Sequence, residues 1–338
     1  MMKYSTRRLC VWGGLLGIVY ITFIYRHNIL AYSALVYWKA NWGELNTAAS
    51  LLHHHKFDKT RFAEVRKDLK KFINIQEPVL CQANTKIGYK YYGIYFKEDV
   101  KIDEVKRGLL AKTFPPKKSR FSKCAIVGNG GILKNSSCGK EIDKSDFVFR
   151  MNMPRIQEFV NDAGRKTNLT SIACSAKTIS DDGDPCGAYY SKEFLNSLKE
   201  YNGYLLWVPS SWTHASSMKS AFTFAELLQK NSNLQLVLSN AEYSHKFSEY
   251  WHINGKSISS GMTMVSIGLS FCEEIHLYGF WPFPVDTSGN SLPMHYSEDI
   301  PWTTYQWTHG FSTEFSLLTE LHRQGVLKLH VENCDLNI

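Results

Sequence analysis

Features that would point to other kinds of protein are absent from this 338-residue sequence. No two cysteines stand in the Cys-x-x-Cys spacing that structural zinc sites use, and no segment repeats at a regular interval. Zinc-finger and solenoid architectures are therefore excluded. Only one apolar run is long enough to enter a membrane, which argues against a channel or a transporter.

What the sequence does contain is ordinary for a globular enzyme. Hydrophobic residues make up 44% of the chain, and this length is sufficient to bury a large core. The formal net charge is +8, so an acidic ligand would be attracted. We expect one catalytic domain that follows an N-terminal extension.

The N-terminal extension carries an uncharged, mostly apolar run at residues 9–25. As a helix this run would be about 26 Å long, which suits a thin bilayer of the early secretory pathway. A cleaved signal peptide is the alternative, but no Ala-x-Ala-like cleavage site follows the run. Lys3, Arg7 and Arg8 precede it, so the positive-inside rule leaves the short tail in the cytosol.

The sequence therefore predicts a type II membrane protein whose main part is lumenal. The boundaries that we expect are a cytosolic tail at residues 1–8, a transmembrane anchor at 9–25, a stem and the start of the lumenal domain at 26–80, and the catalytic domain at 81–338. A histidine tract at residues 53–55 is expected to be a solvated part of the stem, because adjacent side chains point in different directions and suit a metal poorly. Nucleic acid is excluded as a partner by the lumenal location.

A lumenal location also changes how cysteines and asparagines are interpreted. Seven of the eight cysteines follow the anchor, where disulfides can form, but their spacing does not determine the pairing. N-glycosylation is expected at Asn135 and Asn168, each of which begins an Asn-x-Ser/Thr sequon.

Beyond residue 120, apolar runs of strand length alternate with stretches of helical period. The expected strands are residues 124–127, 147–150, 171–174, 204–208, 234–238, 275–278 and 327–331, and the expected helices between them are residues 217–230, 241–251, 261–271 and 312–324. This alternation predicts an α/β fold, with a mostly parallel sheet covered by helices on both faces. A ligand would then lie at the carboxyl ends of the strands.

Four ordered blocks of sequence stand out in this region. They are Gly128-Asn129-Gly130-Gly131 with Phe149-Arg150-Met151-Asn152, then Ser259-Ser260-Gly261 with Tyr278-Gly279-Phe280-Trp281, then His295-Tyr296, and finally His309 with Glu314. Glycines that follow a strand let backbone N–H groups approach a phosphate or a sugar closely. Taken together, the blocks resemble the large, small, third and very small sialylmotifs of sialyltransferases, in the form found in the α2,8-sialyltransferase family.

The resemblance implies a Rossmann-like variant of the nucleotide-sugar glycosyltransferase fold in the Golgi membrane, with CMP-sialic acid as donor and a sialylated glycan on lipid or protein as acceptor. The residues that match the family's donor-binding positions are Asn129, Asn152, Ser259, Ser260, Gly261, Gly279 and Trp281. The resemblance also implies disulfides between Cys124 and Cys272 and between Cys138 and Cys334, which leaves Cys81, Cys174 and Cys186 for one further bridge and one odd thiol.

Two histidines are expected to carry the chemistry. His309 matches the last motif and would act as general base on the acceptor hydroxyl, because an imidazole titrates near neutral pH. His295 would stabilise the departing CMP, although the family's usual His-Tyr-Tyr-Asp reads His-Tyr-Ser-Glu in residues 295–298. Direct displacement would invert the anomeric configuration. No metal cofactor is expected, since CMP leaves with a single phosphate that hydrogen bonds can stabilise.

Alternatives to this interpretation stay open. Asp182 and Asp184 form an Asp-x-Asp pair that a metal-dependent glycosyltransferase could use, although a turn is favoured there. A catalytically silent Golgi protein that binds a glycan or a nucleotide is the other alternative. The resemblance also implies one or few additions rather than a long polyanion, because the family's polysialylating members carry a basic segment before the last motif, whereas residues 277–308 contain no Lys or Arg. The sequence leaves the oligomeric state open, a homodimer included.

Overall fold

The computed structural model describes residue 52 and residues 55–73, 77–92, 99–115, 120–172, 189, 191–208, 216–253, 258–298, 300–302 and 309–337. The expected anchor, the Asp-x-Asp pair at 182 and 184, and Cys174 and Cys186 lie outside this part of the chain. Among the described residues, no helix combines the length and the apolar character needed to cross a membrane.

The described residues form a mostly parallel sheet of eight strands. Its members are β1 (Val79–Leu80), β4 (Phe121–Val127), β5 (Phe147–Arg150), β6 (Leu169–Ile172), β7 (Tyr204–Trp207), β8 (Gln235–Ser239), β9 (Cys272–Tyr278) and β10 (Lys328–His330). They are ordered β1-β8-β7-β6-β5-β4-β9-β10, and only β1 runs antiparallel to its neighbour. A separate antiparallel pair joins β2 (Lys90–Tyr92) to β3 (Asp99–Lys101). The predicted α/β fold with a parallel sheet is confirmed.

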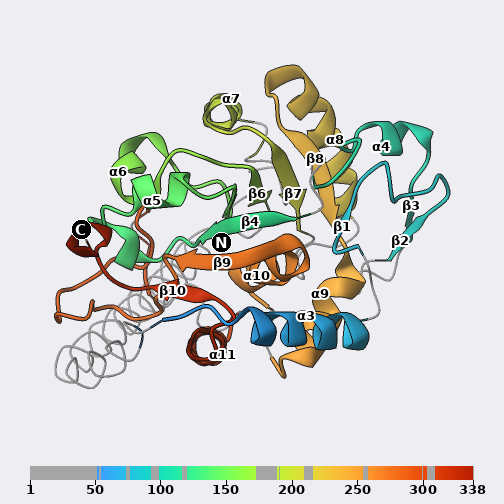
Figure 1. The fold of residues 1–338 in the computed structure, drawn as a ribbon. Helices are drawn as coiled ribbons and strands as arrows, with labels where there is room; N and C mark the ends of the chain where they lie inside the picture. The colour runs from blue at the N-terminus through green and yellow to red at the C-terminus, as the bar shows by residue number, and fades with distance from the viewer. Residues whose placement is uncertain are drawn as a thin grey trace, which may run out of the picture.

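Helices cover both faces of this sheet, which makes three layers (Figure 1). One face carries α3 (Lys59–Ile73), α9 (Ala241–Tyr250), α10 (Ser260–Phe271) and α11 (Phe311–Arg323), which share one apolar core with β4 and β9. The opposite face carries α5 (Gly139–Asp143), α6 (Val160–Ala163), α7 (Lys192–Ser197) and α8 (Ser216–Asn231). The short α4 (Glu104–Gly108) precedes residues that pair with β8. Strands that are covered on both faces have no side exposed to solvent, so their sequences are continuous apolar runs and not alternating patterns.

The buried helix α10 and two disulfides hold the domain together. Nine of the twelve residues of α10 are buried, and this helix packs against β4 and β9. Cys124 is bonded to Cys272, which links these two neighbouring strands, and Cys138 is bonded to Cys334 beside the start of α5. Both pairings are those that the resemblance implied. Cys81 is buried and unbonded.

The helix α3 lies within residues 26–80, where we expected the stem and the start of the lumenal domain. Phe62, Val65 and Leu69 of α3 are buried, and the helix packs against α9. The expectation of a solvated tract is wrong for His55, whose ring lies 4.5 Å from that of Phe57 and 4.6 Å from that of His322, measured between ring centroids. Most charged residues of α3 lie on its outer side, but Arg66 is buried and donates to the carbonyl of Leu269 at 2.7 Å, so apolar packing and this hydrogen bond fix the helix to the domain.

Candidate active site

The order of the strands reverses at β4, which lies between β5 and β9. Ligands of open α/β sheets bind outside the carboxyl ends of the strands at such a reversal. The loops that follow β4 and β9 meet there: the N–H of Gly128 donates to the carbonyl of Tyr278 at 2.7 Å, and the N–H of Gly130 donates to that of Gly279 at 2.9 Å. The first two motifs are therefore joined by their backbones.

Close packing of these two loops explains why glycines stand in them. A Cβ atom on Gly128 would lie 2.6 Å from the carbonyl oxygen of Gly279, and one on Gly130 would lie 2.5 Å from the same atom. Gly279 itself has φ of +72°, in the left-handed region that favours glycine. These glycines are thus required by the contact between the loops, whatever ligand the loops receive.

The third motif lies against the same glycine loop. The N–H of Gly131 donates to the carbonyl of Met294 at 3.1 Å, and that of Tyr296 donates to the carbonyl of Asn129 at 2.9 Å. A backbone bridge pairs Gly130 with His295. His295, expected beside the leaving group, is therefore held opposite the loop expected to receive the donor.

The two asparagines that are expected to bind the donor follow the neighbouring strands β4 and β5. The side-chain amide of Asn129 donates to the carbonyl of Met151 at 3.1 Å, while its Oδ1 atom is buried and has no hydrogen-bond partner among the described residues. Asn152 is exposed and has φ of +58°. Its N–H donates to Oγ of Ser171 at 3.1 Å. Asn129 therefore offers a free acceptor for a hydroxyl group, at the place where the motif predicts donor binding.

The second and fourth motifs meet at the start of α10. Ser259 caps this helix, because its Oγ accepts from the N–H of Met262 at 3.2 Å. The N–H of Ser259 donates to Oε1 of Glu314 at 2.9 Å. Ser260 and Gly261 form the first turn, whose N–H groups have no intrahelical partner and suit an anion. A Cβ on Gly261 would lie 2.8 Å from the ring of Phe280, so this turn packs directly on the loop after β9.

Glu314 is a buried carboxylic acid beside His309. Its exposed fraction is 4%. Burial raises the pKa of Glu314, whereas its hydrogen bonds to Ser259 and the charge of His309 act in the opposite direction. His309 lies just before α11, with its ring 5.5 Å from that of Phe311. The expected general base is therefore within electrostatic reach of a buried carboxyl group that also positions α10.

Trp281 is buried within the loop after β9 and packs against other residues of that loop. Only 4% of it is exposed, its indole N–H donates to the carbonyl of Val285 at 2.8 Å, and its ring packs 5.0 Å from Phe283 and 5.6 Å from Phe315. The indole N–H is thus already used within the protein. Any contribution of Trp281 to the donor site comes from shaping the loop or from its ring.

Arg150 and Tyr296 belong to the quoted motifs, but the sequence analysis assigned them no role. Arg150 is fully buried and donates from Nε to Oγ1 of Thr167 at 2.9 Å and from Nη2 to the carbonyl of Ala163 at 2.8 Å. Its guanidinium also faces the phenol of Tyr296; burial raises the pKa of that phenol to about 12, and Arg150 opposes the rise. The sequence signal for these contacts was a charged residue, Arg150, at the end of an otherwise apolar strand, two residues before Asn152.

The two sequons differ in accessibility. Asn135 is exposed in a turn, with φ of +62°. Asn168 accepts the N–H of Val148 at its Oδ1 atom at 2.9 Å, and Thr170 of its sequon is buried in β6. The folded structure therefore has room for a glycan at Asn135. It disfavours a glycan at Asn168, because the side chain of Asn168 is hydrogen-bonded to β5 and a glycan on it would collide with the paired strands β5 and β6.

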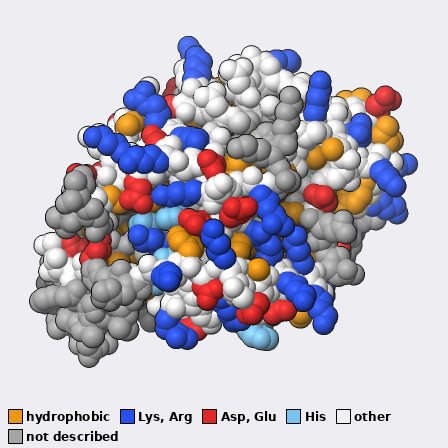
Figure 2. Space-filling view, in the orientation of Figure 1, with side chains coloured by type: hydrophobic (Ala, Val, Ile, Leu, Met, Phe, Trp, Pro, Cys, Tyr) orange, Lys and Arg blue, Asp and Glu red, His pale blue; other side chains and the backbone are white. Residues whose placement is uncertain are grey.

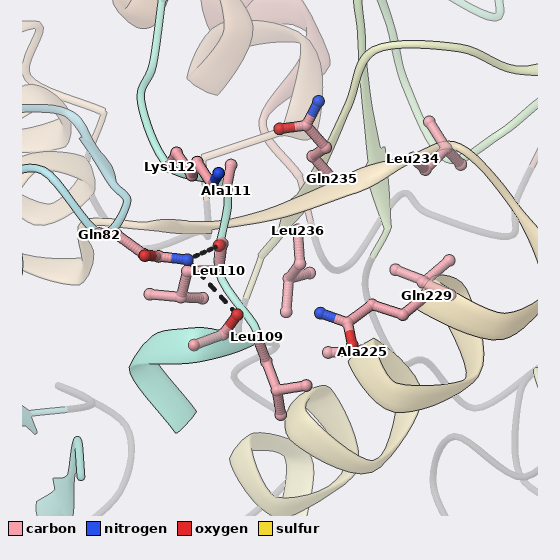
Figure 3. Close-up of a pocket in the computed structure, with 12 residues that line it drawn as sticks. Gln82, Leu109, Leu110, Ala111, Lys112, Ala225, Gln229, Leu234, Gln235 and Leu236 are labelled. Carbon is pink, nitrogen blue, oxygen red and sulfur yellow. Dashed lines mark hydrogen bonds between the residues drawn. The ribbon is translucent and has the colours of Figure 1, made fainter. Parts of the chain in front are cut away.

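A cavity of about 420 Å³ lies elsewhere, between α8, β8 and the segment after α4 (Figure 3). Leu109, Leu110 and Leu236 line it together with glutamine side chains, and Gln82 closes one side by donating to the carbonyl of Leu110 at 2.6 Å. None of the expected site residues lines this cavity. The candidate active site is therefore defined by the convergence of the four motifs at β4 and β9.

Glycine loops, the N-terminus of α10 and two histidine segments meet at the strand reversal of this parallel α/β sheet, which is where enzymes with open α/β sheets bind nucleotide ligands. The model of glycosyltransferase family 29 (sialyltransferase) matches residues 74–326, and the chain belongs to this family. It is a sialyltransferase, an enzyme class that transfers sialic acid from CMP-sialic acid to a glycan.

Individual relatives agree with this assignment. The chain is 32% identical over 264 residues to an alpha-N-acetylneuraminide alpha-2,8-sialyltransferase from Xenopus laevis, which covers 77% of this chain and 72% of the relative. Among solved structures, a mammalian sialyltransferase has a TM-score of 0.54 at 20% identity. The same kind of enzyme in complex with Gal-beta-1-3GalNAc-ortho-nitrophenol has a TM-score of 0.50 at 18% identity. Each comparison covers 79% of this chain and 94% of the solved chain, and at these identities the likeness concerns the fold.

Proposed function

We propose that this protein transfers sialic acid from CMP-sialic acid to the 8-hydroxyl of a terminal sialic acid on a glycolipid or glycoprotein glycan. The observation that supports the α2,8 linkage is the 32% identity to the Xenopus alpha-2,8-sialyltransferase. The absence of Lys and Arg from residues 277–308 supports one or few additions, because a growing polyanion would find no cationic track there.

The proposed mechanism is a single displacement with inversion. His309 takes the proton of the acceptor hydroxyl as the new bond forms between that oxygen and the anomeric carbon, and the bond from the anomeric carbon to the CMP phosphate breaks. The negative charge that develops on the phosphate is stabilised by His295 and by the N–H groups at the start of α10. Asn129, whose Oδ1 atom is buried without a partner among the described residues, receives a donor hydroxyl.

Glu314 supports this mechanism by its position. It accepts the N–H of Ser259 at 2.9 Å and faces His309, so one carboxyl group orients the anion-binding turn and stabilises the imidazolium that forms when His309 takes a proton. The chemistry needs no divalent ion, because CMP leaves with one phosphate and fixed hydrogen-bond donors surround the place where its charge develops. We therefore propose metal-independent transfer.

We also propose a type II Golgi membrane protein with a lumenal catalytic domain. The apolar run at residues 9–25, flanked by Arg7, Arg8 and Arg26, supports the anchor. The disulfides between Cys124 and Cys272 and between Cys138 and Cys334 suit an oxidising compartment.

The decisive experiment incubates the full chain with CMP-sialic acid and a panel of sialylated and unsialylated glycolipids and glycoproteins, with and without EDTA. Products are digested with linkage-specific sialidases. We expect EDTA-resistant transfer onto sialylated acceptors only, with a product that α2,3- and α2,6-specific sialidases leave intact. Transfer to galactose-terminated acceptors would overturn the linkage, and loss of activity in EDTA would support the metal-dependent alternative. Binding of CMP without any transfer would identify a silent binding protein.

A further inference from the structure

A group of metal-ligating side chains lies outside the candidate active site, on the face of the sheet that α5 covers. Glu141 of α5, His276 of β9 and His330 of β10 each offer one ligand atom, and these atoms lie within 4.8 Å of one another. Nδ1 of His276 is 2.9 Å from Nε2 of His330. Figure 2 shows histidine side chains at the surface near the ends of β9 and β10, between acidic and basic side chains.

The strand register brings the two histidines together. In the parallel pair of β9 and β10, Lys328 is opposite His276 and His330 is opposite Tyr278, so His276 and His330 are diagonal neighbours on one face. Tyr278 fixes both remaining ligands: its ring stacks on that of His330 at 4.2 Å, and its hydroxyl donates to Oε1 of Glu141 at 3.0 Å. The three ligand residues are therefore oriented by packing before any ion arrives.

The facing nitrogens of the two histidines share a proton. Nδ1 of His276 and Nε2 of His330 form a hydrogen bond at 2.9 Å, so one of them carries the proton and the other accepts it. His276 is only 7% exposed, and its Nε2 atom has no hydrogen-bond partner among the described residues. A metal ion bound between the rings would replace this hydrogen bond, and the displaced proton would move to the other nitrogen of its ring.

We propose that Glu141, His276 and His330 bind a Zn²⁺ ion. Two imidazole nitrogens and one carboxylate oxygen, with water as the fourth ligand, are a donor set that zinc accepts in tetrahedral geometry. Calcium and magnesium prefer oxygen ligands throughout and fit this set poorly. Two nitrogens bound to one tetrahedral zinc are about 3.4 Å apart, so the histidine rings must separate by roughly half an ångström from their present distance.

Two lysines limit the affinity of this site without blocking it. Nζ of Lys123 lies 3.6 Å from Oε1 of Glu141, and 29% of the Lys123 side chain is exposed, so it can turn to solvent when the carboxylate takes a metal. Lys328, on the same face as His330, adds a second positive charge. We expect weaker binding than in closed zinc sites that have four protein ligands.

The zinc ion would be structural: it would connect a helix to two strands and take no part in the transfer reaction. It would connect α5, which lies between the two parts of the first motif, to β9, which leads into the Gly279 loop, and to β10 near the C-terminal disulfide at Cys334. An ion that binds the folded state stabilises it by mass action. Zinc should therefore change the thermal stability of the protein, and removing it should leave the transfer mechanism intact.

The test titrates the EDTA-treated and dialysed full chain with ZnCl₂, MgCl₂ or CaCl₂, and records the unfolding temperature and the competition with a zinc-binding dye. We expect the unfolding temperature to rise with zinc only. His330→Gln and Glu141→Gln should each weaken zinc binding at least tenfold and remove the rise, while His245→Gln should change neither, although His245 also has a glutamate partner, Glu249, at 3.2 Å. Glu141→Gln keeps an acceptor for the hydroxyl of Tyr278.

Other zinc-binding groups are controlled separately. The double variant His53→Gln/His54→Gln removes the rest of the histidine tract and should retain the response. Where a ligand variant does not fold, the spectrum of the Co²⁺-substituted wild-type chain distinguishes a tetrahedral nitrogen and oxygen site from loose octahedral binding. Absence of zinc binding by the wild type, octahedral cobalt, or equal binding by His330→Gln would each overturn the proposal. None of these outcomes bears on the sialyltransferase assignment, which the EDTA-resistant assay tests.

Discussion

At the scale of single residues, Glu314 connects two motifs that stand 55 residues apart, because it accepts the N–H of Ser259. Glu314→Ala leaves that buried N–H without an acceptor, which should cost about 1–3 kcal/mol of stability and displace the start of α10. Glu314→Gln keeps an oxygen acceptor and removes only the charge beside His309. We expect Glu314→Gln to fold normally, to lower kcat more than it changes KM, and to shift the acidic limb of the pH–rate profile. An unchanged profile would mean that Glu314 acts on α10 alone.

Arg150 is the second residue whose role depends on a distant motif. Its guanidinium donates to Thr167 and Ala163 in the segment before β6. The same group faces Tyr296, the neighbour of His295 in the sequence. The buried hydroxyl of Tyr296 has no hydrogen-bond partner among the described residues, so Tyr296→Phe should change stability by less than about 1 kcal/mol, whereas Arg150→Met leaves buried carbonyl groups unpaired and should cost roughly 3 kcal/mol. Denaturant unfolding measures both. Transfer rates on the folded Tyr296→Phe variant then test the positioning of His295: we expect a lower kcat with little change in KM for CMP-sialic acid, and equal rates would contradict it.

At the scale of elements, the contact between the loops after β4 and β9 makes a sharp prediction. Gly128→Ala places a Cβ 2.6 Å from a backbone oxygen of the other loop, and backbone cannot move aside as a flexible side chain can. We expect the loops to separate and CMP binding to weaken at least tenfold, as measured by calorimetry. Gly108→Ala is the matched control, because its Cβ meets no atom within 4 Å and alanine favours the helix α4. Similar CMP affinity in both variants would show that the loop contact does not shape the site.

At the scale of the whole molecule, what could be predicted from the sequence depended on the range of the interactions concerned. The sequence predicted β5 at residues 147–150, and the strand spans Phe147–Arg150. Its two ends were predictable because a buried apolar run between polar residues determines them locally. The strand expected at residues 171–174 begins two residues earlier, at Leu169, because pairing with Phe149 of β5 sets its start; residues 173–174 lie outside the described part of the chain. Short elements such as β2 and β3, and the burial of Tyr91, were missed because they depend on tertiary contacts, here the hydroxyl donated to the carbonyl of Ser239 at 2.6 Å.

The features of the candidate site also separate into those that the sequence predicted and those that only the folded structure revealed. The identities of His309, Asn129 and the motif glycines could be recognised from the sequence, since each motif is a local pattern. The hydrogen bond of Glu314 to Ser259, the contact of Arg150 with Tyr296 and the meeting of the Gly128 and Gly279 loops could not, because they join segments that only the folded sheet brings together.

The buried histidines make the stability of the whole domain depend on pH. In the folded state burial lowers the pKa of His276 to about 3 and that of His322 to about 4, and it also lowers the pKa values of His55 and His330. In the unfolded chain each histidine titrates near 6.5. Below that pH the unfolded state binds more protons than the folded state, so these groups reduce stability as the pH falls from about 6.5 towards 4. Glu314 acts in the opposite sense, because burial raises its pKa.

A histidine that stays neutral in the folded state contributes a loss of up to about 1.4 kcal/mol per pH unit well below pH 6.5, so His276 and His322 each reduce stability in this range, against the opposite contribution of Glu314. Denaturant unfolding in EDTA at pH 7.5, 6.5 and 5.5 measures this dependence. His322→Gln preserves an acceptor for the N–H of Leu329, which now bonds Nδ1 of His322 at 2.9 Å, and should reduce the slope by one histidine's share. His245→Gln removes a surface histidine from α9 and should retain the wild-type slope. A stability that stays level between pH 7.5 and 5.5 would mean that these histidines are already charged in the folded protein.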